Sequence, residues 1–113
     1  MIAIPLNNEE ENSGLSKKFG KAKYFAFINN NKIEILKNEQ EDKKAVVSWL
    51  KDKNVNILIA FHVGEKTFQN LKDNGIKVYF SGTNKIKIDE VLLKYADGEL
   101  PILNKLSFLC HVV

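Results

Sequence analysis

The stretch Val55–Phe68, which reads Val-Asn-Ile-Leu-Ile-Ala-Phe-His-Val-Gly-Glu-Lys-Thr-Phe, decides the fold of this chain. Its apolar run Ile57–Ala60 is too short for a helix. A short apolar run bounded by polar residues is typical of a strand buried on both faces of a parallel sheet. After this run the spacing of the apolar residues changes. Phe68 and Leu71 lie three positions apart with polar residues between them, which is the spacing of one helix face. The stretch therefore predicts a central strand, a turn and an amphipathic helix.

The turn between this strand and helix, Phe61-His62-Val63-Gly64, is the first candidate site. In open α/β sheets, ligands bind at the carboxyl edge of the strands, where helix N-termini point inward. His62 is one of two histidines in the chain, and a neutral imidazole at such an edge suits iron. We therefore predict that His62 is a metal ligand and that Gly64 leaves backbone N–H groups open to an anion. The alternative for His62 is an exposed loop histidine, or one that is satisfied by a backbone carbonyl.

The sequence on both sides of this stretch predicts further strands and helices. A first strand is expected within Met1–Leu6 and stops at Pro5, and a long irregular loop follows over Asn7–Lys23. Asparagine tolerates the left-handed conformation of tight turns, so Asn29-Asn30-Asn31 predicts a hairpin. Further strands are expected at Tyr24–Ile28, Lys32–Leu36 and Ile76–Phe80. One helix is expected from Asp42 to about Lys53 and another from Ile88 to Tyr95, and the helix that contains Phe68 and Leu71 is expected to end near Gly75.

The order of these elements predicts the fold class. Alternating strands and helices in the second half imply parallel strands joined by right-handed crossovers, whereas the hairpin implies at least one antiparallel strand. We expect an α/β protein with one domain over residues 1–113, built as a mixed five-stranded sheet flanked by three helices. The apolar patches between Glu99 and Val113 predict that the tail packs on the body or on a partner, so a homodimer is one expected assembly.

Composition restricts the compartment and the partners. No apolar run approaches the ~20 residues that span a bilayer, and the first residues lack the features of a signal peptide. We therefore expect a cytoplasmic protein without membrane association. The net charge is +3, but all 17 basic residues are lysines. Because arginine supplies the bidentate contacts that dominate base readout, we expect no nucleic-acid partner.

Two further groups of residues are candidates for binding an anion or a metal. The lysines of the first loop form a possible electrostatic funnel for an anion, and the alternative is a solvated loop. Cys110-His111 supplies one thiolate and one imidazole, and two copies across a dimer would make four ligands. The alternative is a buried structural cysteine followed by a surface histidine. The lysines of the first loop are Lys17, Lys18, Lys21 and Lys23.

The sequence offers little support for catalysis. A nuclease of the ribonuclease H type needs carboxylates clustered at strand ends to hold two metal ions. The first expected strand has none, and the next two offer only Glu34. The GxSxG, P-loop and dinucleotide-binding motifs are also absent. We therefore expect that the chain is not an enzyme. A metal-dependent hydrolase would require carboxylates that converge in the predicted site.

Five segments follow one another in a recognisable order. They are Ile2-Ala3-Ile4-Pro5, Phe19-Gly20-Lys21-Ala22-Lys23-Tyr24-Phe25, Gly64 leading into Phe68, Gly75-Ile76-Lys77-Val78-Tyr79, and Gly98-Glu99-Leu100. Their order and spacing resemble the dinitrogenase iron–molybdenum cofactor biosynthesis family, also called the nitrogenase accessory factor family. The resemblance runs from residue 1 to about residue 103 and leaves the apolar tail 104–113 outside it.

The resemblance implies a fold similar to ribonuclease H and a carrier rather than a catalyst. Several members of the family bind the iron–molybdenum cofactor or its iron–sulfur precursors and carry them between assembly proteins. The chain differs from the family pattern at two places. Lys18 stands where a histidine commonly precedes Phe-Gly, and Phe61-His62-Val63-Gly64 replaces a common Gly-Gly-x-Gly turn. A different histidine thus lies near the expected opening of the site.

We therefore predict a cofactor site in the cleft formed by the first loop, the His62 turn and the turn Ser81–Asn84. In this interpretation His62 ligates an iron–molybdenum cofactor or iron–sulfur cluster, which is delivered to a cluster-assembly or acceptor protein. The alternative is a protein-interaction module on the same fold that binds no cofactor. The predicted cofactor-binding residues are Lys18, Phe19, Gly20, Lys21, His62, Gly64, Ser81 and Gly82.

Overall fold

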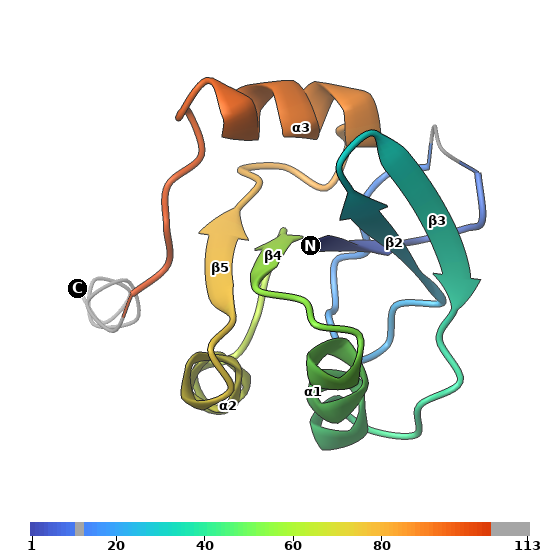
Figure 1. Ribbon diagram of the computed structural model, residues 1–113, viewed down its shortest axis with the longest axis vertical. Coiled ribbons are helices and arrows are strands. Elements are labelled where there is room, and N and C mark those ends of the chain that lie inside the picture. The colour runs from blue at the N-terminus through green and yellow to red at the C-terminus, as the bar shows by residue number, and fades with distance from the viewer. Residues whose placement is uncertain (11–12, 105–113) are drawn as a thin grey trace.

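The structure, a computed structural model, describes residues 1–10 and 13–104, which form one five-stranded sheet with helices on both faces (Figure 1). The strand order is β3-β2-β1-β4-β5. The β1–β2 and β2–β3 pairs are antiparallel, and the β1–β4 and β4–β5 pairs are parallel. This arrangement confirms the predicted mixed α/β fold. The strands are β1 (Ile2–Leu6), β2 (Tyr24–Asn29), β3 (Lys32–Lys37), β4 (Ile57–Ala60) and β5 (Lys77–Phe80), and the helices are α1 (Lys43–Asp52), α2 (Glu65–Asp73) and α3 (Ile88–Ala96).

The central strand β4 is buried on both faces, as its apolar run predicts. Leu58 and Ile59 are both fully buried but belong to different core clusters, because successive side chains of a strand point to opposite faces. The cluster around Leu58 includes residues of α1 and α2, and the cluster around Ile59 includes residues of α3. Figure 1 shows the same division, with α1 and α2 below the sheet and α3 above it.

Pro5 lies inside β1, so the prediction that the first strand stops at the proline is wrong by one residue. Pro5 pairs with Phe25 of β2, whereas the pairing of β1 with β4 ends at Ala3. The carbonyl oxygen of Pro5 accepts a hydrogen bond from the Ser16 N–H at 3.0 Å, on the side away from β2. The backbone N and O of one strand residue point to the same side of the strand, so the nitrogen of Pro5 also points away from β2. The proline therefore removes no hydrogen bond between β1 and β2.

The predicted turns and caps are present with small shifts of boundary. Asn30 adopts the left-handed conformation in the hairpin, with φ +57°. The carboxylate of Asp42 accepts a hydrogen bond from the Ala45 N–H at 2.8 Å and caps α1. Gly75 follows α2 with φ +76°, as expected of a residue that ends a helix. β5 begins at Lys77, one residue later than predicted.

The segment after α3 returns along the free edge of β5. The Phe80 N–H donates to the Pro101 carbonyl at 2.9 Å, and the Leu103 N–H donates to the Val78 carbonyl at 2.8 Å. Leu103 packs against the core cluster of α1 and α2. The part of the tail that the structure describes, up to residue 104, therefore packs on the body of the protein. The predicted Cys110-His111 pair lies outside the described residues.

No helix in the described part of the chain is long and apolar enough to cross a membrane.

Candidate functional site

Three loops meet at the carboxyl edge of β1, β4 and β5, and backbone contacts hold them together. The Ser81 N–H donates to the Ala60 carbonyl at 2.9 Å, which joins the ends of β4 and β5. The Leu15 N–H donates to the Asn84 carbonyl at 2.9 Å, which joins the first loop to the turn after β5. A Cβ atom at Gly14 would lie 2.8 Å from that same carbonyl oxygen, so the close approach requires glycine.

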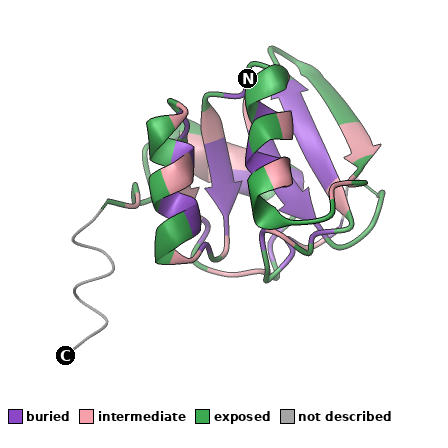
Figure 2. Cartoon of the chain, turned by 90° about the horizontal axis from the view of Figure 1, so that it is seen from below, coloured by how far each residue is buried: buried purple, intermediate pink, exposed green. Residues whose placement is uncertain are grey.

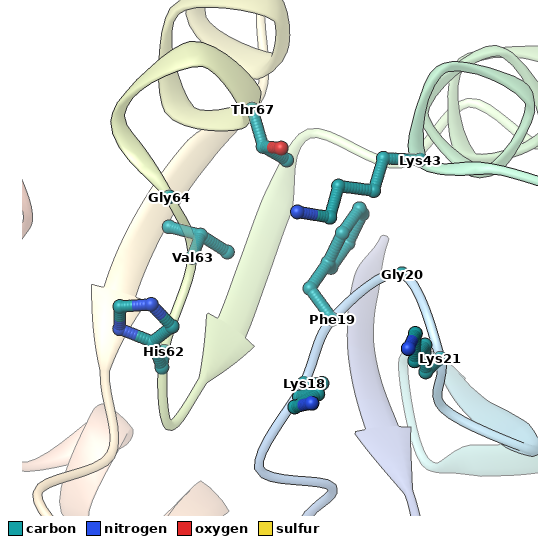
Figure 3. A pocket seen from close by; sticks show the side chains of 9 residues that line it. All are labelled: Lys18, Phe19, Gly20, Lys21, Lys43, His62, Val63, Gly64 and Thr67. Carbon is teal, nitrogen blue, oxygen red and sulfur yellow. The ribbon is translucent and has the colours of Figure 1, made fainter.

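A pocket of about 290 Å³ lies where the first loop faces the His62 turn and the start of α2 (Figure 3). It brings together six of the eight predicted cofactor-binding residues from two segments that are more than forty positions apart in the sequence. The residues that line it are Lys18, Phe19, Gly20, Lys21, Lys43, His62, Val63, Gly64 and Thr67.

Phe19 anchors the first loop beneath this pocket. Its side chain is buried, and its ring packs edge-to-face on Phe25 with the ring centroids 5.7 Å apart. Phe25 in turn packs edge-to-face on Trp49 of α1 at 5.7 Å. The Ser16 hydroxyl donates to the Lys18 carbonyl at 2.9 Å and closes the turn before Phe19. The apolar anchor therefore fixes the loop while its neighbour Lys18 remains exposed.

Gly20 allows Lys43 of α1 to cross the loop and reach the pocket. A Cβ atom at position 20 would lie 2.4 Å from the Cγ of Lys43, so any larger residue would displace that side chain. Figure 3 shows the Lys43 ammonium extending over Phe19 toward Thr67. Lys43 occupies the first turn of α1, where the helix dipole disfavours a cation. The helix dipole therefore does not stabilise Lys43, whose side chain lines the pocket.

The N-terminus of α2 forms the opposite wall. Gly64 is the N-cap residue and has no side chain to accept a hydrogen bond from the first turn. The first N–H groups of an α-helix have no partner within the helix, and they carry the positive end of its dipole. The hydroxyl-bearing side chain of Thr67 also points into the pocket (Figure 3). This wall therefore adds hydrogen-bond donors and partial positive charge, and the acidic residue of this first turn, Glu65, does not line the pocket.

The pocket carries one sign of charge. Three lysines and the exposed imidazole of His62 line it, and no Asp or Glu does. Among the described residues, no group of three or more His, Cys, Asp or Glu side chains could hold a metal ion. The lining residues thus favour an anion over a cation. The carboxylates that a metal-dependent hydrolase would require do not converge in this pocket.

Ser81 and Gly82 do not line this pocket, although they lie at the same edge of the sheet. Ser81 is buried, and its hydroxyl donates to the Thr83 carbonyl at 2.8 Å within its own turn. Gly82 has φ +81°, which explains a glycine there by backbone conformation alone. The turn contacts the first loop at Leu15 and then leads into α3 on the other face of the sheet.

Three lining residues, Lys43, Val63 and Thr67, were not predicted from the sequence. Val63 lies between the predicted residues His62 and Gly64, and Thr67 lies three residues after Gly64, so both follow from the position of the turn. One sequence signal for Lys43 was available. It directly follows the capping residue Asp42 and so lies in the first turn of the helix, where the dipole disfavours a cation. Of the four lysines of the first loop, Lys18 and Lys21 line the pocket and Lys17 and Lys23 do not.

Comparisons with known proteins agree with this fold. A family model described as "Dinitrogenase iron-molybdenum cofactor" matches residues 1–98. No curated protein matches the chain at a significant level.

Several solved structures share the fold, among them the following three. A candidate NifB protein from Thermotoga, of the DUF35 family, is 29% identical with a TM-score of 0.75, over 90% of this chain and 91% of that one. The apo form of the orange protein from Desulfovibrio gigas is 20% identical with a TM-score of 0.81, over 90% of this chain and 91% of that one. A candidate dinitrogenase from Methanocaldococcus jannaschii is 22% identical with a TM-score of 0.68, over 91% and 93% of the two chains.

Proposed function

Because the chain belongs to the dinitrogenase iron–molybdenum cofactor family, we propose that it binds an anionic metal cluster in the pocket at Lys18–Lys21 and His62. The cargo is an iron–molybdenum cofactor or an iron–sulfur cluster, and the chain delivers it to a cluster-assembly or acceptor protein without catalysing a reaction. The observation that carries this proposal is a pocket lined by three lysines, one imidazole and an uncapped helix N-terminus, with no carboxylate.

The donor set suits a cluster better than a bare metal ion. A bare ion needs several protein ligands, and no such group exists among the described residues. A cluster brings its own sulfide ligands and net negative charge, so the protein has to supply mainly cations and one additional ligand. A lysine contributes about 1 kcal/mol to a unit anion about 4 Å away in a water-like medium. Three lysines therefore contribute about 3 kcal/mol, to which the His62 ligand bond and the N–H groups of α2 add.

Reversible binding is what delivery requires. His62 is exposed and so is each of the three lysines, which leaves the cargo accessible to a partner. Release of the cargo to a competing protein then breaks charge contacts and one bond to the His62 imidazole, and no thiolate–metal bond at this pocket. Ser81 and Gly82, which lie outside this pocket, are retained in the proposal as residues that a larger cluster contacts from the neighbouring turn.

The test is anaerobic titration of the purified protein with a synthetic iron–sulfur cluster and with the iron–molybdenum cofactor. Binding is followed by quenching of Trp49, the single tryptophan, which contacts Phe25 beneath the pocket. The comparison is wild type against His62→Ala, with Lys32→Ala on the exposed strand β3 as a control. We expect at least about tenfold weaker binding for His62→Ala, since a metal–nitrogen bond is lost, and no change for Lys32→Ala.

Each other outcome leads to a definite conclusion. If the His62→Ala protein binds as wild type does, the metal ligand lies elsewhere, and Cys110 and His111 are the next residues to test. If neither protein binds either cluster, the carrier proposal is refuted. A protein-interaction module on the same fold then remains.

A further inference from the structure

A second hollow, which we call the α1–α2 groove, runs between the two helices on the same face of the sheet. It measures about 500 Å³. It shares the lining residues Lys43 and Thr67 with the pocket that contains His62, which we call the cluster pocket, so the two hollows are adjacent. Figure 2 shows α1 and α2 side by side, with their buried sides toward the sheet and exposed residues outward. The residues that line the groove are Lys43, Lys44, Ser48, Lys66, Thr67 and Asn70.

The groove is basic from both sides and contains no carboxylate. Lys44 and Ser48 lie four residues apart on α1, and Lys66 and Asn70 lie four residues apart on α2, so each pair shares one helix face. Each helix thus contributes a lysine and a neutral polar side chain to the groove. The result is a strip of cations with hydrogen-bonding groups between them.

The cations of α1 are placed against the helix dipole. The first turn of α1 contains Lys43 and Lys44 and no acidic residue, although that position favours carboxylates. Glu41 and Asp42 precede them and line a neighbouring hollow together with Gly20, Lys21, Lys43 and Lys44. The carboxylate of Asp42 accepts the Ala45 N–H. Neither acidic side chain lines the α1–α2 groove, although both share the neighbouring hollow with Lys43 and Lys44.

We propose that the α1–α2 groove docks an acidic segment of the protein that gives or receives the cargo. This inference rests on the proposed function, since the shared residues Lys43 and Thr67 would place the partner beside the cluster. Lysines pair with the Asp and Glu side chains of such a segment. The hydroxyls and the amide of Ser48, Thr67 and Asn70 both donate and accept hydrogen bonds, which suits a polypeptide backbone.

The charge pattern favours a peptide over a nucleic acid. The chain contains 17 lysines and no arginine, and 14 acidic residues leave a net charge of only +3. A nucleic-acid surface typically combines a strongly basic domain with arginine forks on phosphates and bases. A short strip of three lysines fits a few carboxylates of a partner instead.

The test uses a short fluorescein-labelled peptide of alternating glutamate and serine, and a short thymidine oligonucleotide of equal charge. Binding is measured by anisotropy at about 20 mM and about 300 mM salt, because exposed ion pairs weaken with screening. The variants are Lys44→Ala/Lys66→Ala in the groove and Lys32→Ala/Lys37→Ala on β3 as a control. Both pairs remove two exposed lysines, and neither pair lines the cluster pocket.

We expect the groove variant to bind the glutamate peptide about fivefold more weakly than wild type, as the loss of two exposed ion pairs implies. The control variant should bind within twofold of wild type. An equal loss in both variants would mean that net charge alone attracts the peptide, and the inference would fail. Tighter binding of the oligonucleotide, lost in the groove variant, would also overturn it in favour of a nucleic-acid partner.

Cluster titration of the groove variant separates this inference from the proposed function. Lys44 and Lys66 do not line the cluster pocket, so this variant should bind the cluster as wild type does. Normal cluster binding without groove-dependent peptide binding refutes the docking site and leaves the carrier intact. Groove-dependent peptide binding without cluster binding refutes the carrier alone.

Discussion

The contact between Gly20 and Lys43 makes a quantitative prediction about stability. Gly20→Ala places a Cβ atom 2.4 Å from the Cγ of Lys43, so the lysine must leave its position over the loop. Forcing a side chain off its rotamer costs about 0.5–1.5 kcal/mol. The φ of Gly20 lies outside the left-handed region, so alanine itself fits the backbone. Without the clash, Gly20→Ala would raise the free energy of unfolding by about 0.4–1 kcal/mol, because alanine lowers the conformational entropy of the unfolded chain.

The assay is a double-mutant cycle. The free energy of unfolding is measured in urea by Trp49 fluorescence for wild type, Gly20→Ala, Lys43→Ala and the double variant. Gly20→Ala should be near neutral or destabilising in wild type and stabilising in the Lys43→Ala background. The coupling between the two positions should be about 1 kcal/mol. Equal effects of Gly20→Ala in both backgrounds would refute the packing of Lys43 over the loop.

Three further predictions concern the core, a helix cap and alkaline pH. Leu58→Ala should lower the free energy of unfolding by about 2–5 kcal/mol because it empties a fully buried site, measured by urea denaturation against the surface control Lys77→Ala. Asp42→Ala should cost about 1 kcal/mol by removing the cap on the Ala45 N–H, and Asp42→Asn should restore most of it. Burial, and secondarily the neighbouring Tyr79, raise the pKa of Tyr95 above its ordinary 10.0. The stability that this shift contributes is present below pH 10.0 and is lost as the pH rises through the folded-state pKa, so Tyr95→Phe should reduce the alkaline loss of stability.

The sheet could be predicted from the sequence because its strands carry local signals. The run Ile57–Ala60 predicts burial on both faces, and Leu58 and Ile59 lie in two different clusters. The asparagines before Lys32 predict the hairpin, and Asn30 adopts the expected left-handed conformation. These features depend on near neighbours in the sequence, which is why they could be predicted without the structure.

The pocket could be predicted only in part, because it depends on how distant segments meet. The edge of the sheet and the residues His62 and Gly64 follow from strand direction. Lys43 enters the pocket only because α1 packs beside the first loop, at a distance that Gly20 permits. Ser81 was expected in the same cleft, but the chain after β5 crosses to α3 on the opposite face, and its hydroxyl bonds within its own turn.

The central claim is that the cationic pocket, rather than surface charge in general, binds an anionic cluster. Two triple variants test it, because each removes three exposed lysines and leaves the same net charge. The pocket variant replaces Lys18, Lys21 and Lys43 by alanine. The control variant replaces Lys32, Lys37 and Lys77, none of which lines the pocket.

The measurement is the dissociation constant for a synthetic iron–sulfur cluster under anaerobic conditions, at one fixed salt concentration, for wild type and both variants. Three lysines at about 1 kcal/mol each predict that the pocket variant binds about a hundredfold more weakly than wild type. The control variant should bind within a few-fold of wild type. Equal affinities for the two variants would contradict the account.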